Sequence, residues 1–238
     1  MKSIEFIFPE LTDIYGESFN MEYLKRCNSE INLINTSYSD KPLFVSGKAD
    51  MVYLGCMTES NQERTLLKLK QYKNEIKQNI ESGVVFLVTG NSIELFGNEI
   101  MGDCVLNEDK FKMEGLGIFD FTSARSMKRE RMNSLFVGEF NGFTLMGHKS
   151  QFSESYGNFS NCFIDLQFGM GMNKGTKKEG IKVNHFFATY SLGPFLVVNP
   201  YFTKYILKLL GLSEHLCFEE DAIRAYNHRL SDVMNYYK

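Results

Sequence analysis

Runs of apolar residues alternate with helical patterns along the first half of this chain. A continuous apolar run at residues 84–88 indicates a strand that is buried on both faces. Shorter apolar runs predict three more strands at residues 4–8, 31–35 and 51–54, with a short helix at residues 21–26. Strands separated by helical segments predict an α/β protein built around a mostly parallel sheet with helices on both faces.

The clearest helical pattern precedes the buried strand. Apolar residues recur three or four positions apart from Leu66 to Ile80, and Gly83 follows as a stop signal. Ser60 and Glu63 have the spacing of a capping box, so we expect the helix to begin there. Strand, helix and strand in this order predict a right-handed parallel crossover, with ligands collecting at the carboxyl ends of the strands.

The second half predicts an added β-hairpin region. Asn141 and Gly142 separate two apolar segments and form a two-residue hairpin signal. Further strands are predicted within residues 163–168 and 181–190. Residues 169–180 are rich in glycine and lysine but lack the spacing of a phosphate-binding loop, so we expect a mobile connection there.

Two helices are expected at the end of the chain. Pro200 is placed to start a helix over residues 201–210, and Gly211 to end it. A second helix is predicted over residues 219–237. Its expected inner side consists of Ala222, Ala225, Leu230 and Val233. No repeat or low-complexity linker interrupts the chain, so residues 1–238 are read as a single domain.

Composition and charge exclude several classes of function. The chain has 238 residues, 43% hydrophobic and 23% charged, with a net charge of −3. A net charge this small and negative creates no positive electrostatic potential that would attract nucleic acid or an anionic membrane, so neither is expected as a partner. No apolar run approaches the roughly 20 residues that span a bilayer, and the N-terminus does not resemble a signal peptide. We therefore expect a cytoplasmic protein.

The cysteines and histidines do not form a recognisable metal or disulfide pattern. Five cysteines are scattered without a Cys-x-x-Cys pair, and we expect buried free thiols. No His-x-x-x-His or His/Asp cluster is present, so neither a metal nor another cofactor is predicted. The cysteines are Cys27, Cys56, Cys104, Cys162 and Cys217.

The turn after the buried strand carries the strongest functional signal. A strand that turns sharply into a helix presents the residue at the turn to a pocket above the sheet, where many hydrolases carry a nucleophile. Here that residue is Gly90, between Thr89 and Asn91, with a short helix predicted from Ser92. Glycine tolerates a strained backbone but has no side chain that can attack a substrate. The loop that begins at Gly55 follows the preceding strand and faces the same crevice.

Several collinear segments resemble the class I glutamine amidotransferase family. The most similar branch contains the cobyric acid synthase amidotransferase domain and the glutaminase subunit of lipid II isoglutaminyl synthase. The segments are IYGESFN at residues 14–20, ADMVYLG at 49–55 followed by Gln62, TGNSIELFG at 89–97, EGLGIFDF at 114–121 and ATYSLGPFLVVNP at 188–200. The resemblance covers Met1 to about Gly211 and implies the flavodoxin-like fold of class I glutamine amidotransferases.

The resemblance also implies that the catalytic residues of the family are missing. In the family, a cysteine thiolate at the elbow attacks the glutamine amide, a histidine transfers the proton, and a glycine-rich loop supplies amides to the oxyanion. The nucleophile falls on Gly90 and the base on Leu192. Losing one such residue in a comparable hydrolase costs on the order of a million-fold in turnover, so no glutaminase activity by this mechanism is expected.

Other pocket positions also depart from the family pattern. The glycine triplet of the oxyanion loop becomes Gly55, Cys56 and Met57, and Lys149, Gln151 and Glu154 stand where the family has Glu, His and Arg. The residues expected to line the pocket are Gly55, Cys56, Met57, Gly90, Asn91, Lys149, Gln151 and Leu192.

Three functional interpretations remain open. The first is a catalytically degenerate amidotransferase-like protein with an interaction or regulatory role, docked on an ATP-dependent Mur-ligase-like subunit or on a second copy of itself. The second is a binding module for an amino-acid-like molecule, with Lys149 and Glu154 reading the ligand's charges. The third is an amidotransferase or hydrolase with a site rebuilt around Cys56. Tyr236 and Tyr237 are candidate aromatics for a partner face.

Overall fold

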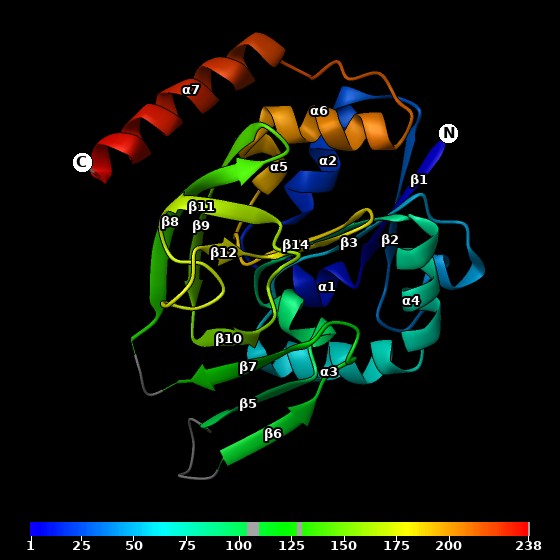
Figure 1. Ribbon diagram of the computed structural model, residues 1–238. Helices are drawn as coiled ribbons and strands as arrows, with labels where there is room; N and C mark the ends of the chain where they lie inside the picture. The colour runs from blue at the N-terminus through cyan, green and yellow to red at the C-terminus, as the bar shows by residue number, and fades with distance from the viewer. Residues whose placement is uncertain (104–109, 128–129, 238) are drawn as a thin grey trace.

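The computed structural model is built on a central six-stranded sheet with the order β13-β14-β4-β3-β1-β2 (Figure 1). It describes residues 1–103, 110–127 and 130–237, so Cys104 lies outside the described residues. All neighbouring strands are parallel except β13, which runs antiparallel to β14. The strands are β1 (Lys2–Ile7), β2 (Ile31–Thr36), β3 (Met51–Leu54), β4 (Val85–Thr89), β13 (Ile181–Val183) and β14 (Phe186–Thr189).

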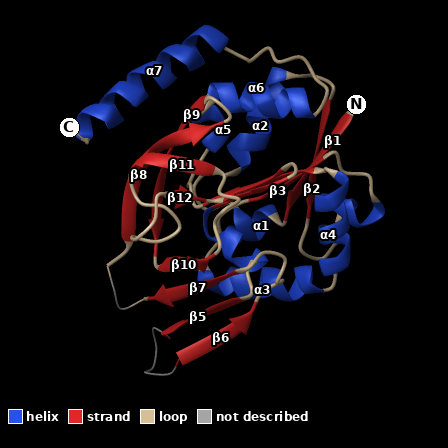
Figure 2. Cartoon of the chain, in the orientation of Figure 1, coloured by secondary structure: helices blue, strands red, loops and turns tan. Residues whose placement is uncertain are grey.

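Helices cover both faces of this sheet, as predicted (Figure 2). The side chains of β4 alternate between the two layers: Val85 and Leu87 pack on one side, Phe86 and Val88 on the other. One layer contains α2 (Ser18–Cys27), α5 (Phe195–Val198) and α6 (Pro200–Leu209). The other contains α1 (Pro9–Thr12), α3 (Glu59–Lys70), α4 (Lys73–Ser82) and the 3₁₀ segments η1 (Leu43–Ser46) and η2 (Gly90–Phe96).

The long helix expected before β4 is two helices, and its predicted cap was wrong. The helical pattern breaks at Gln71 and Tyr72, between α3 and α4. The N-cap of α3 is Thr58, whose hydroxyl accepts a hydrogen bond from the Asn61 amide at 3.2 Å. Threonine caps helices by the same chemistry as serine, so Thr58 can take this role. The capping-box spacing of Ser60 and Glu63 therefore does not mark the start of the helix.

The predicted β-hairpin region is larger than one hairpin and consists of two additional four-stranded sheets. The expected hairpin joins β8 (Met132–Phe140) to β9 (Phe143–Gln151), with positive φ at both Asn141 and Gly142. It belongs to a sheet that also contains β11 (Ile164–Phe168) and β12 (Lys178–Glu179). The other sheet has the order β10-β7-β5-β6. Its strands are β5 (Glu99–Asp103), β6 (Lys110–Glu114), β7 (Phe121–Ser126) and β10 (Ser153–Gly157).

The glycine- and lysine-rich segment at residues 169–180 packs into the protein instead of forming a simple exposed loop. Met172 is fully buried, and Glu179 in β12 is also fully buried. The segment is held by hydrogen bonds from Lys149 to the Gly171 carbonyl and to the Glu179 carboxylate. A lysine from β9, a distant strand of the same sheet as β12, therefore fixes a segment whose own composition suggested an unattached connection.

The last helix, α7 (Glu219–Tyr236), lies against β8, α5 and α6 at the outer edge of the molecule (Figure 1). Tyr226 and Val233 are its buried residues, whereas Ala225 is exposed, contrary to the predicted inner side. The Tyr226 hydroxyl donates to the Thr144 carbonyl at 2.8 Å, which turns this larger side chain inward. Among the described residues, no helix is long and apolar enough to cross a membrane.

Candidate functional site

The carboxyl ends of β3 and β4 place Cys56 against Gly90. The two strands are parallel neighbours, so the loop after β3 and the turn after β4 meet at one edge of the sheet. Gly90 has φ +63°, and a Cβ built on it would lie 2.5 Å from the Cβ and 2.7 Å from the Sγ of Cys56. The Cys56 side chain therefore fills the volume that a side chain at position 90 would need.

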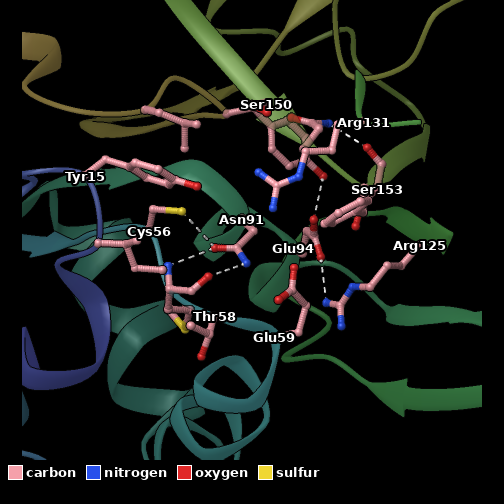
Figure 3. Close-up of a pocket in the computed structure, with 16 residues that line it drawn as sticks. Tyr15, Cys56, Thr58, Glu59, Asn91, Glu94, Arg125, Arg131, Ser150 and Ser153 are labelled. Carbon is pink, nitrogen blue, oxygen red and sulfur yellow. Dashed lines mark hydrogen bonds and ion pairs between the residues drawn. The ribbon is translucent and has the colours of Figure 1, made fainter. Parts of the chain in front are cut away.

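Hydrogen bonds of the Asn91 side chain join the loop after β3 to the turn after β4. Its Oδ1 accepts hydrogen bonds from the Met57 amide at 3.0 Å and from the Cys56 thiol at 3.4 Å. Its Nδ2 donates to the Met57 carbonyl at 2.8 Å. Figure 3 shows Asn91 and Cys56 pointing toward each other across the site. The amide of Met57 is consequently occupied within the protein and is not free for a developing oxyanion.

The loop after β14 presents an aliphatic side chain to the same site. The Ser191 carbonyl accepts from the Gly90 amide at 3.0 Å, and the Leu192 amide donates to the His148 carbonyl at 2.8 Å. These bonds fix the half-buried Leu192 beside the turn at Gly90. Because a leucine side chain cannot exchange a proton, this wall supplies shape and no general base.

A cavity of about 160 Å³ opens between these loops and β9. This volume is below the ~300–1,000 Å³ that is usual for sites of drug-sized ligands, so it fits a small metabolite at most. No histidine from the described parts of the chain lines it. The lining includes Ile14, Tyr15, Cys56, Met57, Thr58, Glu59, Asn91, Glu94, Arg125, Arg131, Ser150, Gln151, Phe152, Ser153, Tyr190 and Leu192.

Comparisons with known proteins identify the family of this fold and site. Residues 3–200 match the family model of the CobB/CobQ-like glutamine amidotransferase domain. The chain belongs to this family. A relative, the lipid II isoglutaminyl synthase (glutamine-hydrolyzing) subunit GatD of Staphylococcus aureus (strain N315), is 28% identical over 200 residues. The match covers 84% of this chain and 78% of the relative.

Solved structures share the fold of this CobB/CobQ-like domain at low sequence identity. A glutamine amidotransferase is 14% identical with a TM-score of 0.54, covering 87% of this chain and 99% of its own. PurLQS from Thermotoga maritima is 10% identical with a TM-score of 0.53, covering 97% and 100%. At these identities the likeness establishes the class I glutamine amidotransferase architecture and nothing about chemistry.

Five of the eight residues expected to line the pocket of this amidotransferase-like domain contact the cavity. They are Cys56, Met57, Asn91, Gln151 and Leu192. Gly55 and Gly90 lie behind it, because their backbones are packed against other groups. A Cβ on Gly55 would be 2.2 Å from the Thr12 carbonyl oxygen, which explains why only glycine fits there.

Lys149 does not line the cavity and was wrongly predicted to read ligand charges. Its side chain is fully buried, its Nζ lies 2.8 Å from a carboxylate oxygen of Glu179, and it also donates to the Gly171 carbonyl. Glu179 in turn accepts from the Thr189 hydroxyl and the Tyr190 amide. This pair joins β9, β12 and β14 beneath the site, so its role is structural. Glu154 is also outside the cavity lining, and it accepts from the Lys174 amide.

A buried ion pair at the cavity floor was missed by the sequence analysis. Arg125 lies 3.3 Å from the Glu94 carboxylate and also donates to Gln62, which itself donates to Glu94 at 3.0 Å. Figure 3 shows Arg125 and Glu94 linked at the edge of the cavity. The signal available was Glu94 itself, a charged residue within the elbow segment TGNSIELFG. An added charge there predicts a compensating cation, but not its position in β7.

Gln151 brings an unpartnered acceptor to the cavity wall. Its side chain is 8% exposed, and its Nε2 donates to the Ser153 carbonyl at 2.6 Å. Its Oε1 is buried and has no hydrogen-bond partner among the described residues. Buried polar atoms are usually paired, so this oxygen is an exception beside the cavity.

The Cys56 thiol is held in its neutral form. Burial raises its pKa to about 12, and the carboxylates of Glu17 and Glu94 add to the effect. A thiol is reactive as its thiolate, which requires a lowered pKa and usually a neighbouring cation or imidazole. The electrostatic setting of Cys56 is therefore opposite to that of a nucleophile.

No group of three or more His, Cys, Asp or Glu residues suited to a metal occurs in the described part of the chain.

Proposed function

We propose that this chain is a catalytically inactive member of the glutamine amidotransferase family that serves as an interaction or regulatory subunit. The observation that carries the proposal is the packing of Cys56 against Gly90 at the elbow. Position 90 has no side chain, and the side chain of Cys56 takes up its space as a neutral thiol. The aliphatic Leu192 at the base position and the occupied Met57 amide support the same conclusion.

A glutamine hydrolysis assay tests the loss of activity. We expect glutamate release by the purified chain to match that of its Cys56→Ser variant, because neither has an activated nucleophile. A missing nucleophile lowers turnover by about a million-fold in a comparable hydrolase, so release should not exceed the background of the assay. Turnover by the natural chain that the Cys56→Ser substitution abolishes would contradict the proposal.

The partner we propose is a Mur-ligase-like ATP-dependent subunit that covers the mouth of the cavity. The name of the Staphylococcus aureus relative describes it as a subunit. Ile14 and Tyr15 line the cavity and are 42% and 45% exposed, so apolar surface is available at its mouth. A contact there would bury these side chains and close the cavity from solvent.

Co-purification with a co-expressed Mur-ligase-like protein tests the docking face. We expect a 1:1 complex that Tyr15→Asp disrupts, because the substitution places a charge in the buried contact. Leu67→Asp is the matched control, since Leu67 is 60% exposed on α3 and is not part of the cavity lining. Equal binding by both variants would contradict this face. A dimer of the chain alone in light scattering would support self-association instead.

The second candidate function is a binding module for an amino-acid-like molecule, and the unpartnered Gln151 Oε1 favours it. If the Gln151 amide turns toward the cavity, a ligand amide or ammonium group donates to this oxygen, and the cavity has no activated nucleophile to turn the ligand over. At a hundred times its dissociation constant, such a ligand stabilises the fold by about 2.7 kcal/mol, or roughly 5–10 °C in Tm for a chain of this size. A thermal-shift series with glutamine, glutamate and related amino acids should show this increase, reduced in Gln151→Leu. No shift with any of them would argue against the module.

A further inference from the structure

A second cavity, of about 330 Å³, lies between α7, the β8–β9 hairpin and the loop after β14. Most of its wall is apolar. The apolar residues include Leu135, Met146, Phe195, Val198 and Val233. Val233 and Arg229 belong to α7, which lies beyond residue 200, where the match to the family model ends. The cavity is therefore completed by a helix outside the part of the chain that the family model matches.

Two polar side chains of this cavity lack partners. Ser191 is 1% exposed, and its hydroxyl makes no hydrogen bond to any part of the chain that the structure describes. A Cβ on Gly147, which also lines the cavity, would lie 2.6 Å from the Ser191 Oγ, so this hydroxyl faces the cavity wall at Gly147. Arg229 is exposed, and it forms no ion pair with the residues described.

An apolar wall with one hydroxyl, one guanidinium group and the imidazole of His148 suits a ligand with an apolar chain and a single anionic end. A guanidinium group binds a carboxylate through two parallel hydrogen bonds, and a buried serine hydroxyl can donate to the same group. The volume falls in the ~300–1,000 Å³ range of small-molecule sites and is about twice that of the first cavity. We propose that this cavity binds a medium-chain monocarboxylate, with its carboxylate at Arg229 and Ser191 and its chain against Val198 and Val233.

The site is independent of the proposed function, although it adjoins the elbow. Leu192 lines both cavities, and the Ser191 carbonyl accepts from the Gly90 amide at 3.0 Å. A ligand that orders the Ser191 side chain would therefore contact the same loop that holds the elbow in place.

Titration of the full chain with octanoate, below the concentration at which it forms micelles, tests the proposal by calorimetry. We expect saturable binding that weakens about tenfold in Arg229→Gln, since a charge-assisted hydrogen bond is lost. Val198→Phe should also weaken binding by filling the cavity. Arg224→Gln is the matched control, because Arg224 lies exposed on the same helix, pairs with Asp221 and does not line the cavity.

Three results with the two ligands and the arginine variants would overturn the proposal. They are the absence of saturable octanoate binding, equal affinity for octanoate and 1-octanol, and equal affinity of the Arg229→Gln and Arg224→Gln variants. The alcohol tests the carboxylate, because it keeps the apolar chain and removes the charge. Both arginines are exposed, so folding of these variants is expected to be unchanged. Because Gln151 lines the first cavity and not the second, a loss of binding in Gln151→Leu but not in Arg229→Gln would place the ligand at the wrong site and also overturn the proposal.

Discussion

At Gly90 the backbone has φ +63°, and the nearest side-chain atoms belong to Cys56. The two positions share one small volume, so only one of them can carry a side chain without rearrangement. Relatives suggested by the sequence resemblance have a cysteine at the elbow and glycine in the loop, whereas this chain has the reverse. The Cys56 sulfur lies beside the elbow, where the resemblance places the family nucleophile. It belongs to the loop after β3, however, and no histidine of the described residues lines the cavity to act as its base.

The loss of stability caused by a cysteine at position 90 should therefore depend on the residue at position 56. We expect Gly90→Cys to destabilise the protein by about 1–3 kcal/mol through overpacking, with strain from the left-handed backbone in addition. In Gly90→Cys with Cys56→Gly, the overpacking is relieved and the double variant should be more stable than the single. A double-mutant cycle from urea unfolding measures this coupling. Additive effects would show that the two side chains do not compete.

The neutral thiol of Cys56 predicts a pH dependence of stability. Burial raises its folded pKa to about 12, above the roughly 8.5 expected for the unfolded chain. Above pH 8.5 the unfolded state loses this proton first, so the contribution to stability is present at lower pH and is lost as the pH rises toward 12. The free energy of unfolding should fall more between pH 8 and 10 for the natural chain than for Cys56→Ser. Identical slopes would contradict the raised pKa.

Among the elements, η2 and β7 are joined by the Glu94–Arg125 pair beneath the cavity. The side chains are 0% and 7% exposed, so each charge depends on the other. Arg125→Met should destabilise the protein by about 3–5 kcal/mol, because it leaves Glu94 buried and unpaired. Glu94→Gln with Arg125→Met should recover much of this loss, as the amide is neutral. Denaturant unfolding gives both values, and a double variant no more stable than Arg125→Met would argue against the pair as the cause.

The packing of α7 against the rest of the protein depends on its two buried residues, Tyr226 and Val233. Val233→Asp places a charge among Val137, Met146 and Tyr226, so we expect the helix to detach while the central sheet stays folded. Asn227→Asp adds the same charge at an exposed position of the same helix and serves as the control. Hydrogen exchange should become faster in α7 and β8 of Val233→Asp only. Faster exchange throughout the chain would mean that α7 is essential to the whole fold.

The sequence predicted the elements whose patterns are local. The buried run at β4, the Asn141-Gly142 turn and the Pro200 helix start were found because strand burial, turn conformation and helix geometry are encoded within a few residues. The sheet of β10, β7, β5 and β6 was missed, because its strands are short and the pairings of β7 with β5 and β10 join segments that are not consecutive in the chain. At the site, the missing nucleophile and base remain predictions that rest on Gly90 and, through the family resemblance, on Leu192. The Lys149–Glu179 and Glu94–Arg125 pairs were not predicted, since partners in other elements are set by tertiary packing.

At the scale of the whole molecule, the family architecture is kept, and we propose that the chemistry of its site is lost. Residues 3–200 retain the amidotransferase fold, and α7 adds a covering element beyond them. The small cavity, its buried ion pair and the apolar mouth at Ile14 and Tyr15 are compatible with binding and docking. None of them provides an activated nucleophile. In our account the scaffold presents a small pocket with a buried ion pair to a partner or ligand without hydrolysing glutamine.

Labelling with an electrophilic diazoketone analogue of glutamine tests this account most directly. The analogue alkylates an activated cysteine, and intact-mass measurement followed by peptide mapping locates any adduct. We predict no adduct on Cys56 in the folded protein at neutral pH, because its thiol is buried and protonated. A stoichiometric adduct on Cys56 that glutamine competes away would contradict the account.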